Sequence, residues 1–272
     1  HYTQWLAKEK NLQFSDYPSL WKWSTDHVAA FWESLWEYFK IEHHTPYTQV
    51  LSGTQMPDFK WFEGAALNYA EHIFRQKTDA RPAIIFQSER HPLSEMSWEE
   101  LEDQTALLAH YFRESGVLPG DRVAAFLPNS PHAVVAVLAT MSGGAVWSSC
   151  SPDFGAASIA DRFVQIQPKV FIAVDGYAYG GKAFDKRETV REICQLLPSV
   201  EKVIFVPFLD ENATLLVDKE VVMWNGIVNP PSFVSAFAKT SAGKKTMAGK
   251  KSSVVNPKSP VPFSHPLWIL YS

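Results

Sequence analysis

Residues 122–206 alternate between short apolar segments of strand length and longer segments whose apolar residues recur at helical spacing. The expected elements are a strand at 122–127, a helix at 130–141, a strand at 145–149, a helix at 156–165, a strand at 170–174, a helix at 186–197 and a strand at 202–206. Parallel strands need a crossover connection, which is usually a helix. The alternation therefore predicts an α/β fold with a mostly parallel sheet and crossover helices.

The segment before this sheet is expected to be a helical cap. Apolar residues at helical spacing predict one amphipathic helix over 24–40 and a short helix over 67–75, with a turn-rich stretch at 45–58 between them. Aromatic residues crowd this cap, and an aromatic stripe at helical spacing is more typical of a core than of a ligand-stacking surface. The tryptophans concerned are Trp5, Trp21, Trp23, Trp32, Trp36 and Trp61.

Between the cap and the sheet, the sequence predicts a strand at 83–87 that pairs with one at 93–96. Ser97 and Glu100 have the spacing of a capping box, which opens a helix. That helix is expected to end at Gly116.

Changes in composition suggest four parts: the helical region 1–75, an α/β subdomain at 76–238, a linker at 239–262 and a strand at 263–272. The linker is rich in Lys, Ser and Gly and has no apolar period that could bury a face. The run from Leu267 to Tyr271 is so apolar that we expect a parallel strand covered on both faces.

Composition excludes several classes of function. The net charge of −4 gives no general attraction to nucleic acid or to an acidic membrane surface, which leaves small molecules as the expected partners. Cys150 and Cys194 are too few for a disulfide framework and too isolated for a zinc site. These features favour a cytoplasmic protein, although the chain begins at His1 and a lost leader stays open.

One segment imitates a nucleotide-binding loop. Residues 176–183 read GYAYGGKA and match G-x-x-x-x-G-K, but Ala183 stands where such a loop needs a Ser or Thr to bind magnesium. We interpret this segment as a Gly-rich turn between a strand and a helix. Gly143 and Gly144 are interpreted as a helix end rather than a dinucleotide site, and His43 and His44 as surface residues without metal spacing.

Several motifs resemble the adenylate-forming superfamily, which includes acyl-CoA synthetases, luciferases and peptide-synthetase adenylation domains. Those shared with the superfamily at large are GDRVA (120–124), LPNSP (127–131) and MSGGAVW (141–147). The segment KWFEGAALNYAE (60–71) is similar to the amino-terminal signature of acetyl- and acetoacetyl-CoA synthetases. The segments WSSCSPDFG (147–155) and DGYAYGGK (175–182) resemble the acetoacetate-CoA ligase branch.

The resemblance implies an ATP-dependent acid-thiol ligase that uses Mg²⁺, with acetoacetate as the expected carboxylate. It would make the coenzyme A thioester with release of AMP and pyrophosphate. The final residues WILYS (268–272) resemble the strand that leads into the phosphate loop of this family, with Ser272 as the first serine of the loop. The catalytic residues and metal ligands of the family would follow Ser272. The resemblance therefore implies an amino-terminal part that is inactive alone, and it assigns no catalytic or metal residue to residues 1–272.

Only the coenzyme A side of the family's site carries over. The resemblance places two loops near the coenzyme A nucleotide, with Phe154 packing on adenine and Lys182 meeting a phosphate; Ala178 stands where relatives often carry a basic residue. The residues concerned are Ser151, Pro152, Asp153, Phe154, Tyr179, Gly181 and Lys182. Two alternatives stay open: an acetate or propionate ligase of the same family, and a non-catalytic α/β module that binds a nucleotide or a protein.

Overall fold

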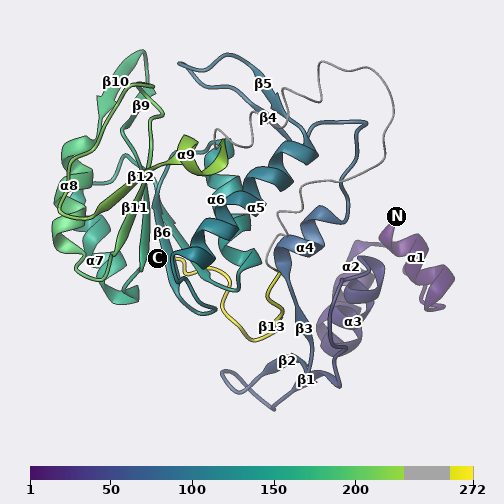
Figure 1. Ribbon diagram of the computed structural model, residues 1–272. Coiled ribbons are helices and arrows are strands. Elements are labelled where there is room, and N and C mark those ends of the chain that lie inside the picture. Colours follow the sequence, from purple (N-terminus) through teal and green to yellow (C-terminus); the bar gives the residue numbers. More distant parts are fainter. Residues whose placement is uncertain (230–257, 272) are drawn as a thin grey trace, which may run out of the picture. The chain divides into compact units, whose positions relative to one another are not determined.

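The computed structural model describes residues 1–229 and 258–271 (Figure 1). These residues form two compact units. The first unit holds His1–Asn68 together with Pro260–His265, and the second holds the described residues between Tyr69 and Ser259 and from Pro266 onward. Residues 239–257 of the expected linker lie outside the described residues.

The first unit begins with helices and continues with short antiparallel strands. Its helices are α1 (Tyr2–Glu9), α2 (Tyr17–Asp26) and α3 (Val28–Tyr38). Strand β1 (Gln49–Ser52) pairs with β2 (Lys60–Glu63), and β3 (Ala66–Leu67) pairs with β13 (Val261–Pro262). The stretch at 45–58, expected to be rich in turns, also includes a strand that the sequence did not predict.

The single helix expected over 24–40 is two helices. Helix α2 starts earlier, at a capping box in which Ser19 N donates to Asp16 Oδ1 at 2.8 Å. The chain then leaves helical geometry at His27, where φ is −126° and ψ is 55°, and α3 begins at the next residue. The start of α2 is set by this capping box, which precedes the apolar residues from which the helix was predicted.

The division into two helices also splits the aromatic stripe. Trp36 is buried and stacks on Phe62 with ring centroids 4.6 Å apart, so the prediction of a core role is right for this residue. It is wrong for Trp21 and Trp32, which are 57% and 44% exposed. The buried core of this unit is small and centres on Trp36, Phe62 and Ala65, so it covers only part of the stripe.

The second unit is built on a five-stranded parallel sheet, in the order β12-β11-β8-β6-β7. The strands are β6 (Arg122–Phe126), β7 (Val146–Cys150), β8 (Val170–Val174), β11 (Lys202–Val206) and β12 (Glu220–Met223). The crossover helices are α6 (Pro131–Ser142), α7 (Ala156–Ile166) and α8 (Arg187–Leu196). The predicted α/β alternation is confirmed, and β12 and the short α9 (Trp224–Val228) are additions to it.

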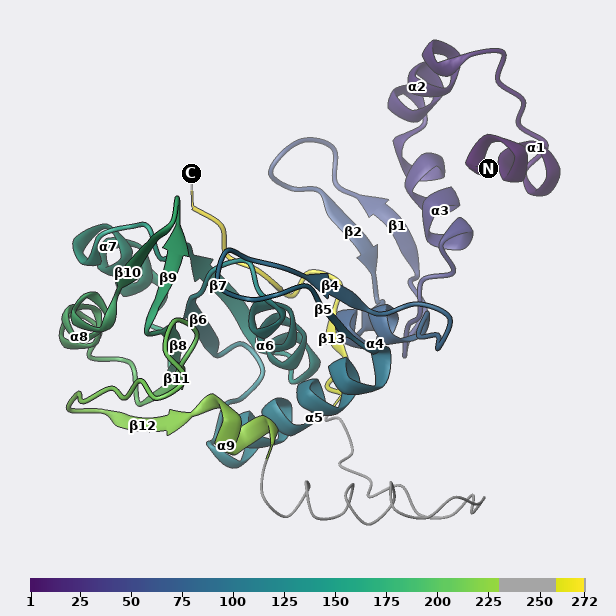
Figure 2. The same cartoon turned by 90° about the horizontal axis from the view of Figure 1, so that it is seen from above.

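Side chains of the central strands enter two cores in turn. In β8, Ile172 packs in one core with residues of α5 (Trp98–Glu114) and α6, whereas its neighbour Phe171 packs in the other with residues of α7 and α8. Figures 1 and 2 show these helix pairs on opposite faces of the sheet. The strands are apolar throughout because both faces are covered.

The elements before the sheet follow the sequence closely. Helix α4 (Tyr69–Phe74) lies within the predicted short helix, and β4 (Ile84–Phe86) pairs antiparallel with β5 (Ser94–Met96). The capping box is present, since Glu100 N donates to Ser97 Oγ at 3.1 Å and Ser97 N donates to Glu100 Oε2 at 2.8 Å. Gly116 follows the end of α5 with φ of 75°.

The run from Leu267 to Tyr271 lies beside β7 but is not covered on both faces. Trp147 N donates to Leu267 O at 2.9 Å, and Ile269 N donates to Trp147 O at 2.8 Å, in parallel register. Trp268 and Leu270, however, are 47% and 77% exposed. The expectation of a fully buried strand is wrong here because the segment lies at the sheet edge, where the described residues cover it only in part.

Candidate functional site

The two loops singled out in the sequence follow the carboxyl ends of parallel strands. Residues 151–154 come after β7, and the turn at 180–181 belongs to a hairpin that comes after β8. Strand β6 lies between β7 and β8 and is parallel to both. Both loops therefore lie along the side of the sheet where its strands have their carboxyl ends. Within the described part of the chain, no hydrogen bond, ion pair or ring contact joins one loop to the other.

The GYAYGGKA segment is a β-hairpin, not the turn into a helix that the sequence suggested. Strand β9 (Gly176–Tyr179) pairs antiparallel with β10 (Lys182–Asp185), and Lys182 lies opposite Tyr179. Gly180 and Gly181 form the two-residue loop with φ of 60° and 72°, the conformation that a tight hairpin turn requires. A phosphate loop instead wraps its backbone around the phosphates at the start of a helix, so the hairpin agrees with the rejection of that interpretation.

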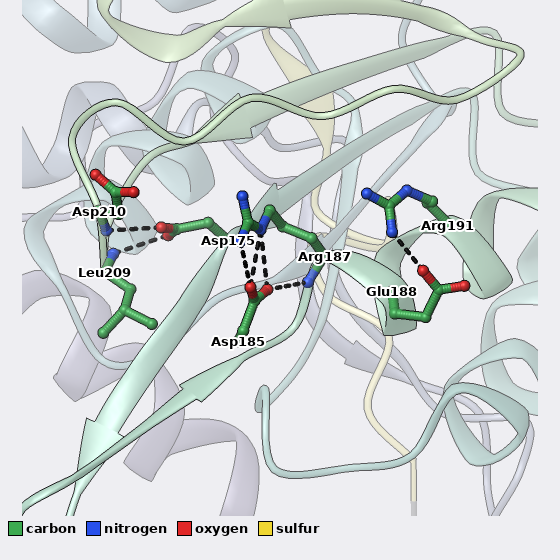
Figure 3. Close-up of polar contacts among 7 residues, drawn as sticks. All are labelled: Asp175, Asp185, Arg187, Glu188, Arg191, Leu209 and Asp210. Atoms are coloured by element: carbon green, nitrogen blue, oxygen red, sulfur yellow. Dashed lines mark hydrogen bonds and ion pairs between the residues drawn. The ribbon is translucent and has the colours of Figure 1, made fainter.

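The hairpin is stiffened by its own side chains. The rings of Tyr177 and Phe184 stack across the two strands at 5.1 Å, and the Lys186 ammonium lies 5.7 Å from the Tyr177 ring centre. Arg187 binds the Asp185 carboxylate at the end of β10 (Figure 3). This hydrogen bond lowers the pKa of Asp185.

The turn of the hairpin is bound by a distant carboxylate. Gly180 N donates to Glu89 Oε1 and Gly181 N donates to Glu89 Oε2, each at 2.8 Å. Glu89 lies in the turn between β4 and β5, which points toward the β9–β10 hairpin in Figure 1. Tyr179 and Lys182 flank this turn and are exposed, and Lys182 has no ion pair within the described residues.

The other loop presents an aromatic ring. Pro152 is buried, whereas Ser151, Asp153 and Phe154 are exposed. The guanidinium of Arg162, from α7, lies 5.0 Å from the centre of the Phe154 ring. Arg162 also donates to Ser158 O at 2.8 Å, which holds it at this position.

An open hollow of about 390 Å³ lies beside Arg162. It is lined by Ser158, Asp161, Arg162, Gln165, Leu270 and Tyr271. The Tyr271 hydroxyl donates to Arg162 O at 2.8 Å, which attaches the end of the described chain to α7. Ser272, the expected first residue of the phosphate loop, lies outside the described residues.

The sheet edge between β6 and β8 is a frequent ligand position in this topology, because the chain connections diverge there. Beside it, a buried carboxylate joins the ends of β8 and β11. The Asp175 carboxylate, which is 2% exposed, accepts a hydrogen bond from Phe208 N. It also accepts from Leu209 N and Asp210 N (Figure 3). This carboxylate is satisfied by backbone donors, whereas the two loops after β7 and β8 present exposed side chains.

His132 lies in the first turn of helix α6. Its ring packs edge-on against Phe208 and Trp224, at 5.9 and 5.2 Å. Burial, with a smaller contribution from the charge of His91, lowers the pKa of His132 to about 4. A histidine held neutral in this way contributes packing rather than a proton at neutral pH.

Sequence reasoning missed Glu89, Asp175 and Arg162. Asp175 carried a signal, because it is a polar residue directly after a buried strand. Glu89 carried none, since its partners are about ninety residues away. Arg162 carried no signal either, because nothing in the helical pattern of α7 marks its contact with Phe154.

His43 and His44 are exposed, as expected. Among residues 1–229 and 258–271, no three His, Cys, Asp or Glu side chains gather as a metal site would require. Cys150 and Cys194 are free and buried, and burial raises the pKa of the Cys194 thiol to about 11. No helix of the described chain has both the length and the apolar character needed to cross a bilayer.

Comparison with known proteins covers the whole chain. The AMP-binding enzyme family model matches residues 71–272, and the model of the acetyl-coenzyme A synthetase N-terminus matches residues 17–73. The acetoacetyl-coenzyme A synthetase of Rhizobium meliloti (strain 1021) is 35% identical over 271 residues, and that of Gallus gallus is 35% identical over 272. These alignments cover 100% and 98% of this chain, and 38% of each relative.

The solved structure of acetoacetyl-CoA synthetase from Streptomyces lividans is also similar. It superposes with a TM-score of 0.84 at 40% identity, over 100% of this chain and 38% of that one. The chain thus spans about 38% of the length of the relatives it matches.

Proposed function

Because the chain belongs to the AMP-binding enzyme family, we propose that it forms the amino-terminal part of an acetoacetate-CoA ligase. The proposal is carried by one observation, the similarity to acetoacetyl-CoA synthetases along the entire chain. The proposed reaction converts acetoacetate, ATP and coenzyme A to acetoacetyl-CoA, AMP and pyrophosphate. We expect a cytoplasmic enzyme of lipid metabolism whose partners are these small molecules.

The proposed reaction has two steps. The carboxylate oxygen of acetoacetate attacks the α-phosphorus of ATP, and the bond to pyrophosphate breaks to leave an acyl-adenylate. The thiolate of coenzyme A then attacks the acyl carbon and releases AMP. Negative charge builds on phosphate oxygens in the first step, so donor groups and Mg²⁺ would stabilise its transition state.

We place none of the groups for the first step on residues 1–271. The family resemblance puts the phosphate loop from Ser272 onward. The contribution we propose for this part is to bind coenzyme A and to support the rest of the site.

Two exposed features support a coenzyme A surface at the carboxyl edge of the sheet. Phe154 offers a flat ring on which adenine could pack, and Arg162 already lies against that ring at 5.0 Å. Lys182 offers an ammonium without an ion pair among the described residues, which suits a phosphate. Ser151, Pro152, Asp153, Tyr179 and Gly181 would shape the two loops around the ligand.

Activity assays on the protein test the proposal. Residues 1–272 together with any residues that follow in the gene should form thioester from ATP, Mg²⁺ and coenzyme A faster with acetoacetate than with acetate. Equal or reversed preference would favour an acetate or propionate ligase.

A matched assay tests the division of labour. Residues 1–272 alone should form no thioester above background, because the groups for adenylate formation are placed outside them. Turnover by this segment would contradict that placement. If the longer protein also forms no thioester with any short acid, the non-catalytic module becomes the better description.

A further inference from the structure

The contact between Glu89 and the β9–β10 turn joins two hairpins that are far apart in the sequence. Both oxygens of the carboxylate are used, one by Gly180 N and one by Gly181 N, at 2.8 Å each. These two N–H groups lie in the loop of the hairpin, outside its ladder, where Tyr179 and Lys182 form the last pair. The turn therefore presents two adjacent donors, and an anion already occupies them.

The surroundings of these donors favour an anion with more charge than a carboxylate. Successive backbone N–H groups in a tight turn form a concave anion site. Lys182 adds a positive charge directly after the turn, and no described residue neutralises it by an ion pair. Two backbone donors next to a lysine suit a phosphate monoester, which carries more negative charge than Glu89.

The occupant is held loosely enough to be exchanged. Glu89, Gly180 and Gly181 are all exposed, and hydrogen-bonded ion contacts in water are weak. The backbone beside Glu89 is anchored separately, because His91 Nδ1 is 2.9 Å from Ser88 Oγ and the His91 ring packs on Phe208 at 4.4 Å. Release of the turn therefore requires only that the Glu89 side chain rotate away.

We propose that Glu89 is an internal competitor that occupies an anion site at the β9–β10 turn and yields it to a phosphate group. Under the proposed function, on which this inference rests for the identity of the ligand, that group is a phosphate of coenzyme A. Binding would then exchange Glu89 for the ligand and free the β4–β5 turn from the β9–β10 hairpin. Without ligand, Glu89 keeps the turn closed to weaker anions.

Titration of the isotope-labelled protein with inorganic phosphate tests the exchange directly. The amide resonances of Gly180 and Gly181 should shift as phosphate is added at low ionic strength. Glu89→Ala should lower the Kd about two- to five-fold, the range expected when an exposed competing contact is removed. Glu89→Gln keeps one acceptor oxygen but no charge. Its phosphate Kd should lie between that of Glu89→Ala and that of the unmodified protein.

Glu95→Ala is the matched control, since Glu95 is an exposed glutamate of β5 on the same hairpin and lies outside the contact. It removes the same charge and should leave the phosphate Kd unchanged. A Kd in Glu89→Ala that equals or exceeds that of the unmodified protein would overturn the proposal. So would equal gains in Glu89→Ala and Glu95→Ala, because the effect would then be general electrostatics.

A second titration separates this inference from the proposed function. Coenzyme A should shift the same two amides more strongly than its analogue without the 3′-phosphate, and Glu89→Ala should tighten coenzyme A binding. If phosphate behaves as expected but coenzyme A does not shift these amides, the anion site stands and the coenzyme A assignment fails. If coenzyme A shifts them and Glu89→Ala has no effect, the assignment stands and competition by Glu89 is excluded.

Discussion

Asp175 Oδ1 accepts a hydrogen bond from Phe208 N at 2.7 Å, which ties the carboxyl end of β8 to the residues that follow β11. The same carboxylate accepts from Leu209 N at 2.8 Å and from Asp210 N at 2.7 Å (Figure 3). Three backbone donors thus satisfy a carboxylate that is almost fully buried. The β9–β10 hairpin begins at the next residue, so this bond network also sets its base.

Asp175→Asn should destabilise the protein. The amide group of Asn is a donor, and it would face one of three backbone N–H groups with no acceptor to offer. Hydrogen bonds to a charged group contribute about 1.5–3 kcal/mol, so the free energy of unfolding should fall by about 2–3 kcal/mol. Urea unfolding measures the loss, and Glu211→Gln, the same chemical change at an exposed residue, should cost less than about 0.5 kcal/mol. Equal losses would mean that the network contributes no specific stability.

Gly176→Ala should destabilise the base of the hairpin. A Cβ atom at position 176 would lie 2.3 Å from Phe184 O and 2.8 Å from Leu209 Cδ2, so backbone would have to move. Overpacking of this kind costs about 1–3 kcal/mol. Gly226→Ala is the control, because nothing lies within 4 Å of its added Cβ and the position is in helix α9. Thermal unfolding should show a lower Tm only for Gly176→Ala; an unchanged Tm there would show that the hairpin relaxes freely.

His132 should make stability fall in acid. Its ordinary pKa is 6.5 and burial lowers the folded value to about 4, so the unfolded chain binds a proton that the folded protein excludes. The stability contribution is therefore complete above pH 6.5 and is lost as pH falls toward 4. At 1.36 kcal/mol per pKa unit, the full loss is on the order of 3 kcal/mol.

His132→Phe tests this dependence. The variant keeps a ring against Phe208 and Trp224 but cannot be protonated. Urea unfolding at pH 7 and pH 4.5 should show a smaller loss of stability in acid for the variant than for the unmodified protein. Identical losses would assign the acid sensitivity to other groups.

Lys182→Ala should weaken coenzyme A binding modestly if the hairpin contributes to that site. Lys182 is exposed, and exposed charge contacts contribute up to about 1 kcal/mol, so the Kd should rise by at most about five-fold. Lys202→Ala removes the same charge at the amino end of β11, whereas the hairpin follows the carboxyl end of β8. This variant should change the Kd for coenzyme A little. Calorimetric titration of both variants measures the difference, and equal effects would remove Lys182 from the site.

Local signals in the sequence determined most of the second unit. The apolar strands β6, β7, β8 and β11 and the helices between them were predictable because each element buries residues at its own period, and covered parallel strands have no polar face. The start of α5 was equally clear, since Ser97 and Glu100 satisfy each other's backbone within four residues. The failure of GYAYGGKA as a phosphate loop also followed from one residue, Ala183.

Tertiary structure alone decided the candidate site, because its contacts join residues that no local pattern relates. Glu89 reaches Gly180 and Gly181 across about ninety residues. The same holds for exposure: Trp268 and Leu270 are as apolar as any core strand, yet they are exposed because their segment lies at the sheet edge. Hydrophobicity and spacing indicate what an element can bury, but the neighbours that the fold supplies determine what it does bury.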